Sequence, residues 1–162
     1  MRQISYDELR VIAKDVAQVI RDKHNDYELV AVARGGLTFA QLVAYHLAKP
    51  LHFFIPKDHA LLSAYPLPYP SHVIFLEDVI AEGRTFRILD NYAAHHELWS
   101  WEMIPVVLDS NAPQDIQDRV NTYGIRTSDW IVFPHEEVEK TVEGDRGLFR
   151  DGTGSSANIS IK

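Results

Sequence analysis

Short apolar runs alternate with amphipathic helical segments along most of the chain, a pattern typical of a parallel sheet flanked by helices. Buried strands are predicted at residues 28–33, 51–55, 73–76 and 103–108. Helices are predicted at residues 5–25, 37–48 and 84–96. Ser5 and Glu8 have the spacing of a capping box at the start of the first helix. The pattern therefore predicts a single-domain α/β fold with an open parallel sheet.

The remaining segments carry weaker patterns. Residues 56–71 include three prolines after Tyr65, a composition that resists helix and sheet, so a loop is predicted there. A short helical turn is predicted at residues 113–119 and a short strand at residues 120–123. The folded domain is expected to span residues 1–150, and the Gly- and Ser-rich residues 151–162 are expected to form a mobile tail.

Composition narrows the possible environments and partners. A chain of 162 residues fits one domain, and its net charge of −7 argues against nucleic acid or an anionic membrane as a partner. It has no cysteine, no signal-like start and no long apolar run, so a soluble cytoplasmic protein is expected. None of its eight histidines forms a pair at helical i,i+3 or i,i+4 spacing, so no histidine zinc site is predicted.

The stretch at residues 72–86 carries the first candidate site. An apolar strand ends in two adjacent carboxylates, Glu77 and Asp78, and a turn with Gly83 leads into a helix. The unpaired N–H groups and the dipole at a helix N-terminus favour a phosphate. Paired carboxylates suit sugar hydroxyls or a hard cation such as Mg²⁺. An ordinary strand, turn and helix with a solvated acidic turn is the plainer interpretation of these residues.

A second candidate follows the first predicted strand. Arg34, Gly35 and Gly36 stand between that strand and the next helix. Glycine lets the backbone approach a ligand closely, and arginine offers a planar fork of donors to phosphate oxygens. Because ligands of open α/β sheets bind at the carboxyl ends of the parallel strands, the two segments are expected to form one site.

Together these residues resemble two signatures of the type I phosphoribosyltransferases. Residues 73–85 are similar to the motif that binds phosphoribosyl pyrophosphate, and residues 33–37 are similar to the pyrophosphate loop, most closely that of the xanthine/guanine phosphoribosyltransferases. In that family the pyrophosphate loop often holds a non-proline cis peptide. The resemblance implies an open parallel sheet flanked by helices with a small hood, a lid at residues 56–71, purine salvage and a homo-oligomer.

The resemblance also implies roles for single residues. Phosphoribosyl pyrophosphate and a nucleobase or nucleotide are the implied ligands, and Mg²⁺ is the implied cofactor, held by Asp78. Glu77 and Asp78 are the implied catalytic pair and hold the ribose hydroxyls. The implied substrate-binding residues are Arg34, Gly35 and Gly36 for pyrophosphate, Ala81, Glu82, Gly83, Arg84 and Thr85 for the 5-phosphate, and Asp109, Trp130 and Ile131 for the base.

Three residues depart from the pattern of enzymes that act on 6-oxopurines. Ala81 stands where those enzymes place an aspartate, and Glu82 stands where the phosphate loop usually has threonine. Asp109 follows the strand whose end carries a lysine in the xanthine/guanine enzymes, and as an acceptor it prefers an amino group. An active phosphoribosyltransferase is therefore one hypothesis, and a catalytically weak nucleotide-binding or regulatory protein on the same fold is the second. A phosphoribosyl-handling enzyme with a different acceptor or reverse chemistry is a third, weaker alternative.

Overall fold

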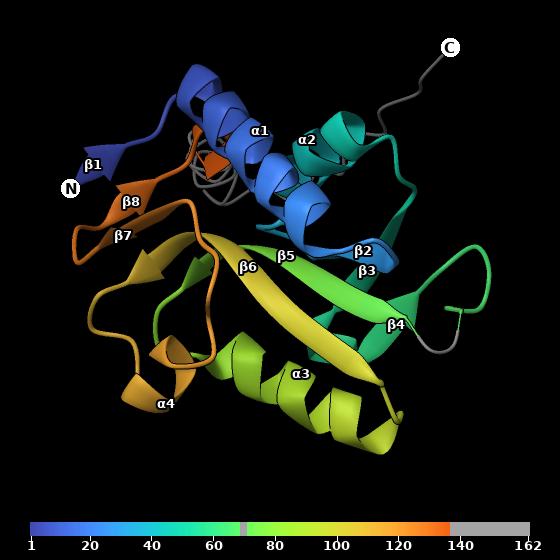
Figure 1. Cartoon of the computed structure of the whole chain (residues 1–162). Helices are drawn as coiled ribbons and strands as arrows, with labels where there is room; N and C mark the ends of the chain where they lie inside the picture. Colours follow the sequence, from blue (N-terminus) through green and yellow to red (C-terminus); the bar gives the residue numbers. More distant parts are fainter. Residues whose placement is uncertain (69–70, 137–162) are drawn as a thin grey trace, which may run out of the picture.

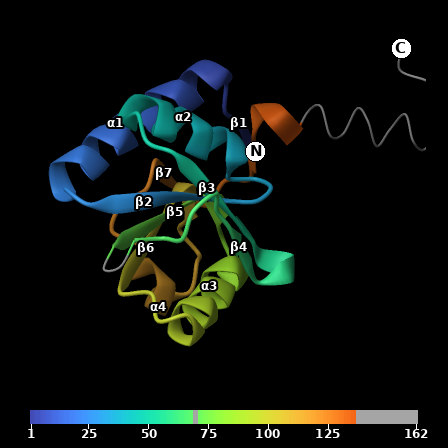
Figure 2. The ribbon, with the colours of Figure 1, turned by 90° about the vertical axis from the view of Figure 1, so that its right-hand side faces the viewer.

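A six-stranded, mostly parallel sheet with helices on both faces forms the body of the protein (Figures 1 and 2). A computed structural model describes residues 1–68 and 71–136. The predicted domain boundary at residue 150 and the predicted tail at 151–162 lie outside these residues. The strand order is β4-β3-β2-β5-β6-β7, so the chain starts near the middle of the sheet and moves to each edge in turn.

The parallel strands all start at one end of the sheet, and their carboxyl ends lie together at the other end. Five of the six run parallel, and β4 alone pairs antiparallel, with β3. Their bounds are β2 Tyr27–Val32, β3 Leu51–Ile55, β4 Ala60–Leu62, β5 His72–Ile80, β6 Ser100–Asp109 and β7 Ile125–Thr127. The predicted α/β class with an open parallel sheet is confirmed.

Two helices cover each face of the sheet. Helices α1 and α2 lie on one face, and α3 and the single-turn α4 lie on the other (Figure 1). Their bounds are α1 Tyr6–Lys23, α2 Leu37–Leu47, α3 Arg84–His95 and α4 Gln114–Gln117. The capping box predicted for the first helix is present: the backbone N–H of Glu8 donates to Ser5 Oγ, and the N–H of Ser5 donates to the Glu8 carboxylate.

Alternation of side chains along the strands fills both halves of the core. On β5, Ile74 and Leu76 pack under α1 and α2, whereas Val73 and Phe75 pack against α3. Period two is the rule for a strand, so both faces of a central strand must be apolar when helices cover both. The same alternation continues past Leu76, so the side chain of Asp78 points toward the face that α2 covers.

A second, two-stranded sheet lies beside the carboxyl ends of the main sheet. It pairs β1, Arg2–Gln3, with β8, Ile131–Val132, in parallel. The first and last described segments of the chain are therefore joined there (Figure 1).

Two local predictions are wrong. Within the predicted loop at 56–71, the single-turn 3-10 helix η1, Pro56–Asp58, leads into β4, which pairs with β3 because residues 60–62 precede the proline-rich part. The short strand predicted at residues 120–123 is absent, and the chain forms β7 at Ile125–Thr127 instead. Among the described residues, no helix has both the length and the apolar character needed to cross a bilayer.

Candidate functional site

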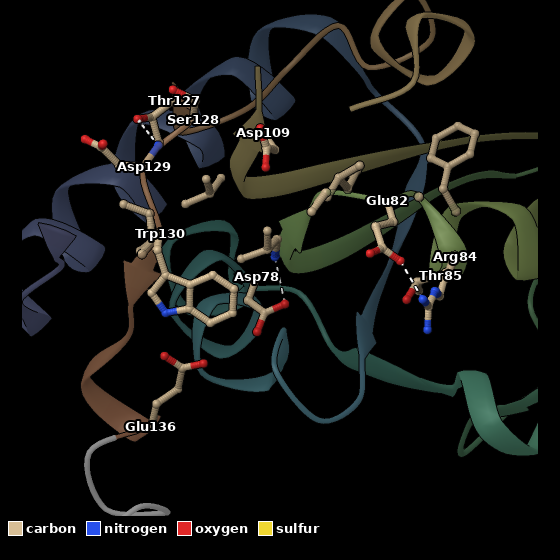
Figure 3. A pocket seen from close by; sticks show the side chains of 17 residues that line it. Asp78, Glu82, Arg84, Thr85, Asp109, Thr127, Ser128, Asp129, Trp130 and Glu136 are labelled. Atoms are coloured by element: carbon tan, nitrogen blue, oxygen red, sulfur yellow. Dashed lines mark hydrogen bonds and ion pairs between the residues drawn. The ribbon is translucent and has the colours of Figure 1, made fainter. Parts of the chain in front are cut away.

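A pocket of about 590 Å³ opens at the carboxyl ends of β5 and β6, between the start of α3 and the strand β8 (Figure 3). It gathers two distant parts of the sequence, the end of β5 with the following loop, and the segment after β7. Among the predicted site residues, those that line it are Asp78, Ala81, Glu82, Gly83, Arg84, Thr85, Asp109, Trp130 and Ile131. The carboxyl ends of the strands, where the sequence predicts a ligand site, therefore border a pocket.

The turn before α3 depends on a glycine for two reasons. Gly83 has φ of +76°, which lies in the left-handed region that other residues rarely adopt. A Cβ atom on Gly83 would also lie 1.9 Å from Cδ1 of Ile116, which packs against the turn from α4. The first backbone N–H groups of α3 have no partner within the helix, as at any helix start. They lie beside the pocket and suit an anion.

Glu82 sits in this anion-binding loop but is paired with a cation. Its Oε2 lies 2.7 Å from Nη2 of Arg84, and both side chains are largely exposed (Figure 3). The pair offsets part of the carboxylate's charge. In high-dielectric surroundings the remaining repulsion toward a bound phosphate is modest.

The glycine loop after β2 lies directly against the acidic end of β5. A Cβ atom on Gly35 would lie 1.8 Å from Oδ2 of Asp78, so the two segments touch at this point. A Cβ atom on Gly36 would lie 2.3 Å from the backbone oxygen of Leu76, also on β5. The Ala33–Arg34 peptide is cis, as the resemblance implies. Gly35 thus adjoins Asp78. Arg34, Gly35 and Gly36 do not line the pocket itself.

The two acidic residues have different surroundings. Asp78 is partly buried, and its Oδ1 accepts a hydrogen bond of 2.7 Å from the backbone N–H of Val79. Glu77 is buried, and its Oε1 accepts from the N–H of Asp78 at 3.0 Å. Burial raises the pKa of the Glu77 carboxyl well above its usual value, and the charge of Asp78 raises it further. Asp78 is therefore the member of the pair that offers a carboxylate to the pocket.

Trp130 and Ile131 form the wall of the pocket on the side of β8. Trp130 is 71% exposed although it is a large aromatic residue. Its backbone oxygen accepts a hydrogen bond of 2.8 Å from the N–H of Arg2, which fixes the main chain at this point. Since neighbouring residues of a strand turn their backbone groups to opposite edges, the N–H and C=O of Ile131 point away from β1.

Four polar lining residues were not predicted from the sequence. They are Thr127, Ser128, Asp129 and Glu136. They come from short irregular segments that have no periodic pattern, and the only sequence signal was their closeness to Trp130. Together with Asp78, Glu82 and Asp109 they make the described lining acidic. Within residues 1–68 and 71–136, Arg84 is the single basic residue of the lining, against five carboxylates. A phosphate-bearing ligand would need a cation beside it in such a pocket.

The residues present fit a magnesium ion. Mg²⁺ takes oxygen ligands and is usually held by one or two carboxylates together with substrate phosphates. Asp78 supplies such an oxygen at the pocket wall, and the acidic lining favours a divalent cation. Among the described lining groups, Asp78 is the one that could hold such an ion.

Comparisons with known proteins give no match at the level of sequence. No protein-family model matches the chain, and no curated protein matches it. The comparison with solved structures does give matches, and among those with the same fold are several purine phosphoribosyltransferases. These matches share 14–20% of their residues with this chain, so they establish the fold alone.

Three solved structures illustrate the likeness. A xanthine-guanine-hypoxanthine phosphoribosyltransferase of Helicobacter pylori is 15% identical, with a TM-score of 0.66 over 88% of this chain and 98% of that one. A purine phosphoribosyltransferase of Pyrococcus horikoshii is 20% identical, with a TM-score of 0.64 over 83% and 92%. A hypothetical protein of Neisseria gonorrhoeae with bound ppGpp is 18% identical, with a TM-score of 0.61 over 90% and 98%.

Proposed function

We propose that the protein transfers the 5-phosphoribosyl group of phosphoribosyl pyrophosphate to a purine or purine-like base and releases pyrophosphate. The observation that carries the proposal is the contact between Gly35 and Asp78 beside the loop at residues 81–85. Two glycine turns and a carboxylate at one sheet edge suit a sugar with a phosphoryl group at each end. The proposal implies purine salvage in the cytoplasm by a homo-oligomer.

Each part of the donor has a counterpart in the site. The N–H groups at the start of α3 and the hydroxyl of Thr85 bind the 5-phosphate. Asp78 accepts hydrogen bonds from the ribose hydroxyls. The buried Glu77 does not line the pocket and supports Asp78 by accepting from its N–H. Arg34 and the backbone near Gly35 bind pyrophosphate. The likeness in fold to purine phosphoribosyltransferases supports this arrangement of roles.

The reaction breaks the bond between C1 of the ribose and the pyrophosphate oxygen, which keeps the electron pair. A ring nitrogen of the base forms the new bond to C1 and gives up its proton to water or to the released pyrophosphate. The transition state is a ribosyl cation beside a departing anion, so the protein contributes mainly positioning and fixed charge. Mg²⁺, when bound at Asp78, neutralises the leaving group.

The base binds between Trp130 and the end of β6. An exposed indole offers a flat face on which any purine can stack. The backbone groups of Ile131 that point away from β1 meet the edge of the base. Asp109 accepts a hydrogen bond, so it favours a base with an amino group over one with an oxo group at that edge.

A nucleotide-binding protein with little turnover is the second candidate. Ala81 and Glu82 favour it, because both depart from the residues that active 6-oxopurine enzymes place there. The Neisseria protein of similar fold, whose structure contains ppGpp, also supports it. On this alternative the same pocket holds a guanosine nucleotide, with the ring on Trp130 and the phosphates at the start of α3.

One assay separates the two candidates. The protein is incubated with Mg²⁺, phosphoribosyl pyrophosphate and a panel of purine bases, and the release of pyrophosphate is measured. Release that requires one base supports the transferase. Tight binding of a guanosine nucleotide, without release for any base, supports the regulatory alternative. If no phosphoribosyl compound binds, both candidates are excluded.

Replacing Glu82 with threonine is expected to strengthen donor binding by about 2- to 5-fold. The substitution removes a carboxylate from the phosphate loop and leaves Arg84 to face the phosphate. The gain should be larger at low salt than at high salt, because exposed charges are screened. Isothermal titration with ribose 5-phosphate measures it. Weaker binding by Glu82→Thr would mean that Glu82 itself supports the ligand.

Replacing Trp130 with alanine is expected to weaken the binding of a nucleoside monophosphate by about 5- to 150-fold, the usual range for loss of one stacked base. Binding of ribose 5-phosphate should not change, since it has no base. Trp99→Ala is the matched control, because Trp99 is also exposed, at 68%, and lies outside the pocket. Equal losses for both ligands would contradict the assignment of Trp130 to the base.

A further inference from the structure

Two histidines and a glutamate lie close together at the end of the sheet where the parallel strands start, opposite the pocket. His24 caps the end of α1, His72 is the first residue of β5, and Glu102 is near the start of β6. Nε2 of His24 lies 2.8 Å from Oε1 of Glu102, and Nε2 of His72 lies 3.2 Å from the same oxygen. Three segments that are far apart in the sequence thus direct one ligand atom each toward a common point.

The two imidazole rings are held in place around the carboxylate. They stack on each other with their centroids 4.3 Å apart, and Nδ1 of His72 lies 2.8 Å from Oγ of Ser100. When Nδ1 donates to Ser100, a metal ion that binds Nε2 would displace the proton that Nε2 donates to Glu102. Metal-binding histidines usually have such a partner on the other ring nitrogen, which fixes their orientation and tautomer.

The carboxylate is charged and the cluster is reached from solvent. Burial alone would raise the pKa of Glu102, but the hydrogen bond from His72 and the charge of His24 outweigh it and lower the pKa. The side chains of His24, His72 and Glu102 are 21%, 18% and 18% exposed. A cation therefore has a path to an anionic oxygen and two imidazole nitrogens that are already gathered.

We propose that His24, His72 and Glu102 bind a zinc ion. Zinc accepts imidazole nitrogen and carboxylate oxygen at about 2.0–2.2 Å, so the ligands of a tetrahedral ion lie roughly 3.4 Å apart. The ligand atoms here lie within 4.8 Å of one another, so small rotations of the side chains suffice to admit the ion. Three protein ligands leave the fourth position to water. Mg²⁺ and Ca²⁺ prefer all-oxygen ligands and suit this cluster poorly.

The ion would stabilise the folded state and would take no part in the reaction at the pocket. It ties the end of α1 to the starts of β5 and β6. His72 and Asp78 are six residues apart on β5. At about 3.3 Å per residue, that separation is roughly 20 Å. Helical spacing of histidines could not reveal the cluster, because parallel strands and a helix end bring its members together.

Zinc binding to the full-length protein is measured by titration against a chromophoric chelator. One ion per chain is expected to bind to the wild-type protein and to Asp78→Asn. His24→Gln, His72→Gln and Glu102→Gln should each lose at least about 100-fold in affinity, and Ser100→Ala about 10-fold, since removal of an outer-shell partner alone costs that much. His59→Asn is the matched control, because His59 is an exposed histidine in a left-handed conformation that asparagine tolerates.

Thermal unfolding gives a second measure that does not depend on activity. Zinc at about 100 times its dissociation constant should raise the Tm of the wild type by about 5–10 °C. The shift should persist in His59→Asn and vanish in Glu102→Gln, even if that variant is less stable without zinc. Bound Co²⁺ should show the intense visible absorption of tetrahedral coordination. Equal zinc affinity of the wild type and all three ligand variants would overturn the proposal, as would binding that Asp78→Asn abolishes.

Discussion

Replacing Gly35 with alanine is expected to lower pyrophosphate release by about 100-fold, the loss that a displacement of about 1 Å in a catalytic group can cause. The added Cβ would lie 1.8 Å from Oδ2 of Asp78 and 2.7 Å from its Oδ1. The three atoms nearest to the added Cβ all belong to the side chain of Asp78, so the carboxylate can rotate aside. The fold should therefore survive, and the free energy of unfolding should fall by no more than about 1 kcal/mol. Urea denaturation and the pyrophosphate assay measure the two effects separately.

Gly36→Ala is the informative comparison. Its Cβ would meet the backbone oxygens of Leu76 and Val32, at 2.3 and 2.8 Å, and these atoms belong to central strands that cannot rotate away. We expect a loss of about 1–3 kcal/mol of stability from overpacking, visible as a lower midpoint of denaturation. If Gly35→Ala were as unstable as Gly36→Ala and its remaining folded fraction fully active, the contact with Asp78 would be structural only.

Much of the fold could be predicted because its pattern is repeated in each βα unit. The buried strands read as apolar runs, and the capping box of Ser5 and Glu8 marks the start of α1 by its local hydrogen bonds. Strand ends were harder to predict. β5 runs on through the acidic pair to Ile80, since pairing with β6 continues past Glu77. The burial of Glu77 follows from this extension and has no counterpart in the residue pattern.

The sequence indicated the two halves of the site but not their contact. Each half has a local signal, glycines after one strand and carboxylates at the end of another. Their meeting depends on the order of strands, in which β2 and β5 are neighbours although two further strands separate them in the chain. The distance from Gly35 to Asp78 is therefore a property of the topology. Thr127, Ser128, Asp129 and Glu136 enter the pocket for the same reason and carry no signal of their own.

The loop at residues 56–71 shows where composition alone fails. A lid over the site was implied, but β4 pairs with β3, and the hydroxyl of Tyr65 donates to Glu28 at 3.3 Å. Glu28 also accepts from His52 at 2.9 Å, at the strand-start edge of the sheet. These hydrogen bonds hold this part of the loop at the end of the sheet opposite the pocket. Composition indicates which regular structures a segment disfavours. It does not indicate which side-chain hydrogen bonds hold the segment in place.

Replacing Asp78 with asparagine is expected to reduce pyrophosphate release by about 10²–10³-fold, the usual cost of removing one group that stabilises charge in the transition state. Asparagine has nearly the same shape, and its amide oxygen can keep the hydrogen bond from the N–H of Val79. The fold should therefore be unchanged, with stability within about 1 kcal/mol of the wild type. Under the proposed function, the substitution removes the negative oxygen that would hold a ribose hydroxyl and Mg²⁺.

Two controls make this result specific. Asp7→Asn changes the net charge equally at an exposed position on α1, outside the pocket, and should leave release unchanged. Binding of phosphoribosyl pyrophosphate, titrated with and without Mg²⁺, tests the metal. The wild type should bind more tightly with Mg²⁺, because five carboxylates line the pocket, whereas Asp78→Asn should gain much less from the ion. Equal gains in both proteins would place Mg²⁺ away from Asp78, and Asp78 would then bind the sugar without the ion.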